Sequence, residues 1–338
     1  MRINREDLLT SLEVVTSGLS PRAIIEQSTC FVFSKGTVMT FNDDVACRHK
    51  TKLKITGAVQ SAPLLAILRK MKEEEVDVNT TTDEDSKLTI AGGKRRIATI
   101  NMEQEILLPI ESVESPKKWR KLPTDFIKAI DKVKDCAGRD ETKFALVCVH
   151  ITPKWIEACD SYQVARYRIK TGLEKSILIR KDSLSHVVNL DMTEFSETES
   201  WIHFRNPIGL IISCRRYIEE YHSKELTAVL KKTGEPTILP KGLQEAADKA
   251  EVFSIENPDN NQVTIKLKAN KLRITGTGVN GDYTEIAKIK YNGKPREFRI
   301  SPRTLVQILD KNVKCEIGDG ILKITDGKFT YVSCLGVE

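Results

Sequence analysis

The sequence contains one run whose letters match a nucleotide-binding motif, Gly-Thr-Gly-Val-Asn-Gly at residues 276–281. In dinucleotide-binding proteins such a run follows a strand and opens a helix, because the helix N-terminus holds the pyrophosphate. Here the following residues, Asp-Tyr-Thr-Glu-Ile-Ala-Lys-Ile, alternate between polar and apolar like a strand. We therefore predict that residues 276–282 are the turn of a β-hairpin.

The other residues that could do chemistry are dispersed along the chain. Its five histidines lack the spacing of a metal site, at positions 49, 150, 186, 203 and 222. His150 stands in an apolar strand pattern, which favours a buried core histidine over a ligand. No phosphate-binding loop, zinc-protease motif or nucleophile elbow is present. We therefore expect no catalytic site, no metal and no cofactor.

Carboxylates leave one enzymatic alternative open. Asp43 and Asp44 fall in a predicted turn, and so does Asp160. A two-metal nuclease needs several carboxylates that converge in space, which sequence alone does not reveal. Solvated turn residues are the simpler interpretation. A metal-dependent nuclease whose turnover requires these aspartates remains the alternative.

Composition and charge indicate an ordinary soluble protein. The 338 residues include 53 lysines and arginines against 47 acidic residues, a net charge of +6 that permits an acidic partner such as nucleic acid. The eight cysteines form no Cys-x-x-Cys pair, which favours reduced, mostly buried thiols. No signal peptide and no apolar stretch of membrane-spanning length is visible. We expect a cytoplasmic protein.

A repeat of pattern runs through the chain at intervals of about 115 to 120 residues. Each copy opens with an amphipathic helix, expected at residues 4–15, 122–133 and 239–253. Asn4 and Thr124 are the predicted N-caps of the first two. A hairpin follows in each copy, at residues 36–53, 154–169 and 270–289.

Each copy continues with a second helix and a closing hairpin. The helices are expected at residues 61–71, 181–190 and 301–310, capped by Ser61, Asp182 and Ser301. The closing hairpins are expected at residues 87–100, 201–218 and 315–335. Runs of strands between helices predict an α+β fold with antiparallel sheets. We place three repeated domains at residues 1–116, 117–232 and 233–338, with polar linkers at residues 111–121 and 231–240.

Four segments resemble the sliding clamp family, the bacterial DNA polymerase III beta subunit. They are the opening MRINREDLLTSLEVVTSGLS, the runs ACDSYQVARYRI and ILIRKDSLSHVV, and the end GILKITDGKFTYVSCLGVE. Cys159 replaces the usual threonine of the second segment, Ser161, Tyr162 and Gln163 replace glycine, histidine and arginine, and the tail lacks a Met-Pro-Met segment. The resemblance covers essentially the whole chain and is that of a divergent member, of the kind that a phage or mobile element encodes.

The resemblance implies a processivity factor and not an enzyme. Two chains would join head to tail into a ring of six domains, with helices lining a hole for duplex DNA. Weak phosphate contacts that exchange with counterions would permit sliding. The implied DNA-contacting residues are Arg22, Lys70, Lys72, Lys128, Lys132, Arg139, Lys143, Arg180, Lys181, Lys241, Lys249, Arg303 and Lys311. For any single one a solvated helix face is the simpler interpretation, so the expectation depends on their recurrence. A basic DNA-binding protein that forms no ring is the second alternative.

The resemblance also implies two protein interfaces. A groove would take short peptide motifs of a DNA polymerase and a clamp loader, unless its residues are only core packing beneath the last strand. Its residues would be Cys159, Ser161, Tyr162, Gln163, Val164, Val229, Val332, Ser333, Cys334 and Leu335. The homodimer interface would pair edge strands around a small apolar cluster of Leu68, Ile97, Val252 and Phe253.

Overall fold

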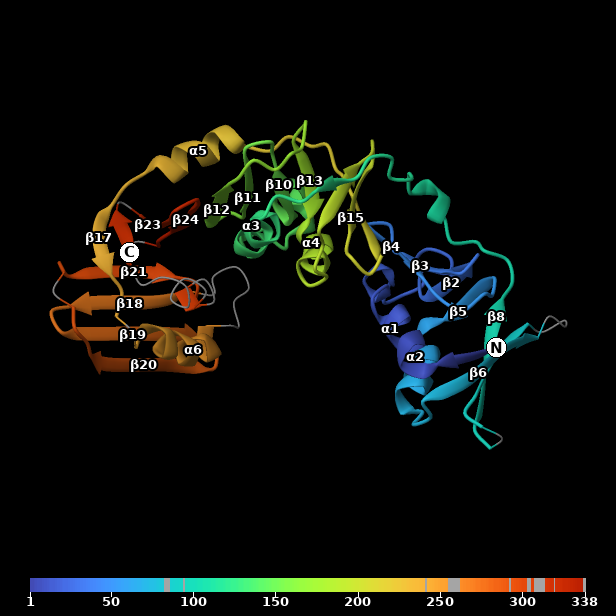
Figure 1. Ribbon diagram of the computed structural model, residues 1–338. Helices are drawn as coiled ribbons and strands as arrows, with labels where there is room; N and C mark the ends of the chain where they lie inside the picture. The colour runs from blue at the N-terminus through green and yellow to red at the C-terminus, as the bar shows by residue number, and fades with distance from the viewer. Residues whose placement is uncertain are drawn as a thin grey trace. The chain divides into compact units, whose positions relative to one another are not determined.

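The structure is a computed structural model whose chain folds into two compact units. It describes residues 1–81, 86–93, 95–240, 242–254, 262–291, 293–302, 305–306, 314–318 and 320–336. Unit 1 comprises Met1–Lys134, Val147–Lys154 and Ile169–Glu219. Unit 2 comprises Asp135–Leu146, Trp155–Arg168 and Glu220–Glu338. Helices pack on antiparallel sheets in both units, so the predicted α+β class is confirmed (Figure 1). The three-domain division near residues 116 and 232 stays a prediction.

Unit 1 is built on a twelve-stranded antiparallel sheet in the order β1-β6-β7-β8-β5-β2-β3-β4-β16-β15-β14-β9. Its strands are β1 Arg2–Asn4, β2 Cys30–Ser34, β3 Thr37–Phe41, β4 Val45–Lys50, β5 Gly57–Gln60, β6 Glu75–Thr81, β7 Lys87–Ala91, β8 Ile97–Glu103, β9 Arg120–Lys121, β14 Glu194–Glu197, β15 Trp201–Arg205 and β16 Ile211–Arg215. Strands β10 Cys148–Ile151 and β13 Ile177–Arg180 pair with each other. His150 lies in β10 and is buried, as predicted.

The pairing of β4 with β16 joins the first two predicted repeats into one sheet. Val45 lies opposite Cys214, and Arg48 opposite Ile211. Beside this joint, the buried Trp201 ring lies 6.1 Å from the ring of Phe41. The core of unit 1 is therefore continuous across the two repeats.

Four α-helices cover unit 1, and their apolar faces follow the predicted 3.6-residue spacing. They are α1 Arg5–Glu13, α2 Ser61–Lys70, α3 Phe126–Val133 and α4 Lys181–Val188. Helix α1 packs against α2, and α3 packs against α4. Leu8 and Leu12 are buried on α1, and Phe126 and Ile130 on α3.

Of the five predicted helix caps, one is right and three are wrong, and the cap at Ser301 stays a prediction. Asn4 caps α1, since its side chain accepts a hydrogen bond from the backbone N–H of Asp7 at 3.0 Å. Asp125, not Thr124, is the N-cap residue of α3. The hydroxyl of Ser61 donates to the backbone of Thr29, so Ser61 does not cap α2. Asp182 lies within the first turn of α4.

Unit 2 contains two antiparallel sheets. The strands β11 Trp155–Cys159, β12 Gln163–Arg168, β24 Phe329–Cys334, β23 Ile321–Asp326, β22 Lys314–Gly318 and β17 Glu235–Ile238 follow one another in that order. The second sheet has the order β20-β19-β18-β21, with β18 Val263–Lys268, β19 Lys271–Gly278, β20 Gly281–Lys288 and β21 Arg296–Ile300. Helix α6 Leu243–Ser254 packs on this sheet through Leu243, Ala246, Ala247 and Ala250, as its periodicity predicts.

Two elements of unit 2 depart from the predicted layout. Helix α5 Ser223–Lys231 was not expected, and it packs against β24. The predicted linker at residues 231–240 contains β17, whose Thr237 lies opposite Cys315 of β22. The prediction of a linker was wrong here, because residues typical of loops, such as Glu235 and Pro236, also occur in edge strands. Of the predicted helix at residues 301–310, Ser301, Pro302, Leu305 and Val306 are described, and all of these except Ser301 are helical.

The glycine-rich run at residues 276–281 belongs to a hairpin, as predicted. Gly278 pairs with Gly281, which leaves a turn of two residues, Val279 and Asn280, narrower than the predicted one. Gly276 lies under helix α6, where a Cβ would overlap the carbonyl oxygen of Ala250. The first glycine of the run therefore permits close packing of helix on strand and has no link to a phosphate.

Candidate functional site

The residues of the predicted peptide groove meet in one apolar cluster of unit 2. Val164 of β12 lies directly opposite Val332 of β24. Both are buried together with Cys159, Leu230 and Ile321. Residues that pack on this cluster while half-buried are Leu146, Tyr221, Leu226 and Val229. The structure thus brings four predicted groove residues together, namely Cys159, Val164, Val229 and Val332.

The remaining predicted groove residues form the border of this cluster. Tyr162 is 54% exposed, and its backbone oxygen accepts a hydrogen bond from the N–H of Cys334 at 2.7 Å. The side-chain oxygen of Gln163 accepts a hydrogen bond from the hydroxyl of Tyr331 at 3.0 Å. Ser161 and Cys334 are exposed, whereas Ser333 and Leu335 are buried. The border therefore exposes one large aromatic ring, that of Tyr162, beside polar groups that bond to one another.

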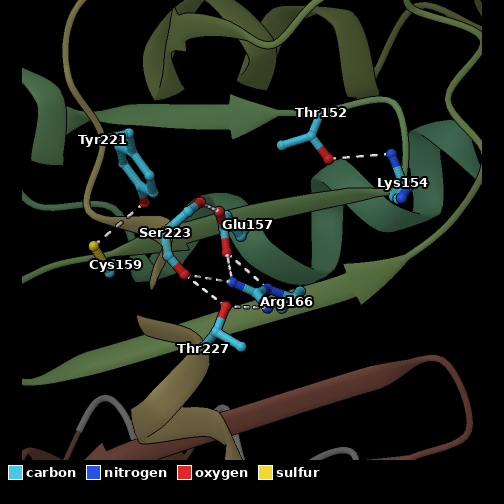
Figure 2. A network of polar contacts seen from close by, with 8 residues as sticks. All are labelled: Thr152, Lys154, Glu157, Cys159, Arg166, Tyr221, Ser223 and Thr227. Atoms are coloured by element: carbon cyan, nitrogen blue, oxygen red, sulfur yellow. Dashed lines mark hydrogen bonds and ion pairs between the residues drawn. The ribbon is translucent and has the colours of Figure 1, made fainter. Parts of the chain in front are cut away.

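A buried polar network fixes helix α5 beside the cluster (Figure 2). Glu157 of β11 is 0% exposed and lies opposite Arg166 of β12 in the strand register. The Nε of Arg166 donates to Glu157 at 2.7 Å, and its Nη1 donates to the hydroxyl of Thr227 at 2.9 Å. The hydroxyl of Ser223, the first residue of α5, donates to the second oxygen of Glu157. The guanidinium also stacks on Trp155 at 4.5 Å.

This network was not predicted, although the sequence contained a signal for it. Glu157 and Arg166 have opposite charges and lie at facing positions of a hairpin whose tight turn sets the register. The alternation of the strand places Glu157 on the same face as the half-buried Trp155 and the buried Cys159. A buried charge is stable only when it is paired and hydrogen-bonded. Opposite charges at facing hairpin positions therefore indicate a buried ion pair when both lie on the inner face.

Cys159 and Tyr221 form the polar part of the cluster. The hydroxyl of Tyr221 donates to the Sγ of Cys159 at 3.3 Å. Burial raises the pKa of the Cys159 thiol to about 11. Burial also raises the pKa of Tyr221, with the neighbouring Cys159 adding to the effect. Both groups are therefore neutral at pH 7, and the thiol is a weak nucleophile in this state.

The basic residues of unit 1 that are expected to contact DNA lie on or next to its helices and differ in charge compensation. Lys70, Lys72 and Lys128 are exposed, and Lys132 and Lys181 are half-buried. Within the described parts of the chain, Lys70, Lys72 and Lys128 make no ion pair, so their charge faces solvent. The side chain of Arg180, by contrast, lies 3.3 Å from a carboxylate oxygen of Asp44.

The loop and unit 2 residues expected to contact DNA differ in exposure and in charge compensation. Arg22, Arg139 and Lys143 are exposed. Lys249 of α6 lies 3.1 Å from Glu245 and 3.4 Å from Glu285, so its charge is compensated locally. Three predicted DNA contacts lie outside the described residues, namely Lys241, Arg303 and Lys311.

The aspartates of the nuclease alternative take part in structural contacts. Asp43 forms an ion pair with Arg215, and the carboxylate of Asp44 accepts a hydrogen bond from the hydroxyl of Tyr217. The carboxylate of Asp160 accepts hydrogen bonds from the backbone N–H groups of Tyr162 and Gln163 at 2.7 and 2.8 Å. No group of three or more histidine, cysteine or acidic residues that could hold a metal ion occurs among the residues the structure describes.

Two strands present unpaired edges with exposed apolar residues. Strand β20 is the last strand of its sheet, and its side chain Ile286 is 53% exposed. On the neighbouring helix α6, Val252 is 67% exposed. In unit 1, β8 is paired with β5 only at its end, at Met102 and Glu103, so that no described strand lies on this side of β8 at its opposite end, Ile97. Ile97 is 64% exposed.

The other two predicted interface residues are less available. Phe253 is half-buried and stacks on Tyr283 of β20, with ring centroids 6.2 Å apart. Leu68 is fully buried in unit 1, and its backbone oxygen accepts a hydrogen bond from Arg5. Leu68 is therefore a core residue on the buried face of α2, and not the exposed interface residue that the resemblance implied.

Seven cysteines are buried, as predicted, and Cys334 is exposed. Over the residues described, no helix is long and apolar enough to span a membrane.

Neither a protein-family model nor a curated protein sequence matches the chain. Solved structures match it over its whole length. They include the DNA polymerase III beta subunit of Thermotoga maritima (13% identity, TM-score 0.79, covering 100% of this chain and 99% of that chain). The DNA polymerase III beta chain of Streptococcus pneumoniae matches at 15% identity and TM-score 0.80, over 100% and 99%. The DNA polymerase sliding clamp of Bacillus subtilis matches at 17% identity and TM-score 0.76, covering 100% of this chain and 98% of that chain. The chain has the fold of these sliding clamps, which confirms the predicted resemblance at the level of the fold.

Proposed function

We propose that this chain is a DNA sliding clamp subunit, a processivity factor with no catalytic activity of its own. The observation that carries the proposal is the agreement of fold with solved sliding clamps over the whole chain. Lys70 of α2 and Lys128 of α3 are exposed and make no ion pair with a described residue, and they support the proposal because mobile phosphate contacts need exposed charge. The apolar cluster around Cys159 and Val332 would receive a short peptide of a polymerase or loader.

Ring formation is the first part of this proposal. Among the residues that the structure describes, no strand pairs with the Ile97 end of β8 on one side or with the outer side of β20, and each strand carries an exposed isoleucine that a second copy could cover. A head-to-tail pairing of these edges must close after two copies, or it would give filaments. We expect a particle of twice 38.1 kDa by sedimentation equilibrium. A strictly monomeric species at all concentrations would contradict the ring.

Substitution of an edge residue tests the interface directly. Ile97→Asp places a charge on the free side of β8 and is expected to shift the protein to the monomer, with at least about a tenfold weaker association. Ile24→Asp is the matched control, because Ile24 is also a highly exposed isoleucine of unit 1 but lies in a loop. Equal behaviour of both variants would show that β8 is not the interface.

Topological retention tests the DNA function. Protein assembled on a nicked circular plasmid and freed of unbound chain by gel filtration should stay with the circle. It should be lost when a restriction enzyme linearises the plasmid, because a ring slides off free ends. Retention on the linear form would favour a basic DNA-binding protein without a ring. Magnesium-dependent cleavage of the plasmid that Asp160→Asn abolishes would favour a nuclease.

A further inference from the structure

Tyr221 covers the apolar cluster that the proposed function assigns to a partner peptide. Its ring packs on the cluster, and its hydroxyl donates to the Sγ of Cys159 at 3.3 Å (Figure 2). The residues around it are exposed, namely Glu220 before it and His222 after it. Tyr221 is therefore an isolated anchor in an exposed stretch of chain.

The position of this anchor is set by the network at the start of α5. Ser223 is joined to Glu157 and to the Nη2 of Arg166, so the chain two residues after Tyr221 is fixed to the β11–β12 hairpin. The segment before Tyr221 has no comparable attachment at Glu219 and Glu220, which are exposed and lie in no strand or helix. The ring can leave the cluster by rotation of its side chain and of the segment before it, while α5 stays in place.

The ring occupies a site with a distinct chemical character. Cys159 contributes a polarisable sulfur, which makes favourable contacts with aromatic rings. Val164 and Val332 contribute stiff β-branched side chains from facing positions of two paired strands. Such a site accepts a flat ring with one polar substituent, and Tyr221 is a side chain of that type.

We propose that Tyr221 is an internal occupant of the peptide site, and that a partner peptide binds by replacing its ring with an aromatic side chain of its own. This inference rests on the proposed function and adds to it the class of the partner's anchor residue. Because the free site exists only while the Tyr221 ring is displaced, the internal occupant lowers the apparent affinity of every partner by the fraction of molecules in which the site is open. Partners whose anchor fits less well than tyrosine are thereby excluded.

Alkylation of Cys159 measures whether Tyr221 covers the site, without any partner or DNA. The full-length protein is treated with iodoacetamide, and the label on each cysteine is followed by mass spectrometry. In Tyr221→Ala we expect Cys159 to react at least about thirtyfold faster than in the native protein, because the thiol loses its cover. In Tyr221→Phe the increase should stay below about tenfold, since only one hydrogen bond is lost and the ring remains.

Two other cysteines are internal controls. Cys334 is exposed and calibrates the reagent, and Cys315 is buried in β22 of the same unit. Both should react in Tyr221→Ala as they do in the native protein. A parallel rise at Cys315 would mean that the substitution loosens the whole unit, and it would overturn the inference. An unchanged rate at Cys159 would overturn it as well.

Small molecules test the aromatic preference. Added p-cresol, the tyrosine side chain as a free molecule, should slow the alkylation of Cys159 in Tyr221→Ala back toward the native rate. Cyclohexanol, which has a similar size and no aromatic ring, should protect at least about fivefold less at equal concentration. Equal protection by both would refute the aromatic class. These rates do not depend on ring assembly or DNA, so their failure is distinct from a failure of the clamp proposal, which the plasmid assay reports.

Discussion

Removal of the Arg166 guanidinium would leave the carboxylate of Glu157 inside unit 2 without its charge partner. Glu157 is 0% exposed, and the hydroxyl of Ser223 also donates a hydrogen bond to it. Arg166→Met keeps much of the length of the side chain and its stacking on Trp155 while it deletes every donor. The variant therefore isolates the charge and hydrogen-bonding role of Arg166 from its packing role.

The expected loss follows from the burial of the pair. Deleting one partner of a buried ion pair costs about 3–5 kcal/mol, because the remaining charge stays desolvated and unpaired. Replacing both partners by apolar residues of similar volume costs far less, and can be neutral, since no buried charge remains. We therefore expect Arg166→Met to be strongly destabilising, and Glu157→Met with Arg166→Met to recover most of the loss.

Hydrogen exchange followed by mass spectrometry is the suitable assay, because it reports opening of the β11–β12 hairpin and of α5 separately from the rest of the chain. A loss of about 3–5 kcal/mol corresponds to exchange that is faster by a factor of roughly a hundred to a few thousand. Peptides from β2 and β15 of unit 1 supply the reference, since they should exchange at the native rate.

The double variant decides the interpretation. If Glu157→Met with Arg166→Met exchanges as fast as Arg166→Met alone, the loss does not come from an unpaired buried carboxylate. If Arg166→Met exchanges at the native rate, the pair does not hold α5, and the fixed position that we assign to Ser223 would be wrong.

Two further predictions concern the cores of the two units. Gly276→Ala should destabilise unit 2 by about 1–3 kcal/mol in thermal unfolding, because the added methyl group overlaps the backbone of α6; Gly242→Ala, where a methyl group meets nothing within 4 Å, should have little effect, and equal losses would contradict the packing role. His203 is fully buried, and burial lowers its pKa from 6.5 to about 4, so the unfolded chain binds a proton that the folded one does not between these values. Stability should therefore fall as the pH is lowered from 6.5 to 4, and His203→Gln should reduce that fall in unfolding scans at pH 7 and 4.5; an unchanged pH dependence would show that His203 does not cause it.

Local patterns in the sequence predicted the local structure well. The apolar spacing of residues 4–15 and 122–133 indicated α1 and α3 with the correct buried faces. The alternation around residues 276–281 correctly favoured a hairpin over a nucleotide site, because a strand and not a helix follows it. Each of these features depends on residues within about one element of one another.

Features that depend on contacts between residues far apart in the sequence were not predicted. The hydroxyl of Ser61 bonds to Thr29 because β2 and β5 are neighbours in the sheet, which no local pattern encodes. No side chain caps α5 at its N-cap residue His222, and the start of the helix is fixed instead by contacts of Ser223 with Glu157 and Arg166 of the distant hairpin. The role of Tyr221 was missed for the same reason. Only the fold places it on Cys159.

The adjacency of β4 and β16 has a consequence for how the protein is made. Strand β4 is synthesised early, but Val45 finds its partner only when Cys214 has been translated. Until then one side of β4 has no strand beside it, and Phe41 lacks the ring of Trp201. A nascent chain that carries only the first repeat thus exposes a sheet edge and an incomplete core for much of its synthesis. Ribosome-bound chains that end shortly before β16 should for this reason be the ones that chaperones capture most strongly.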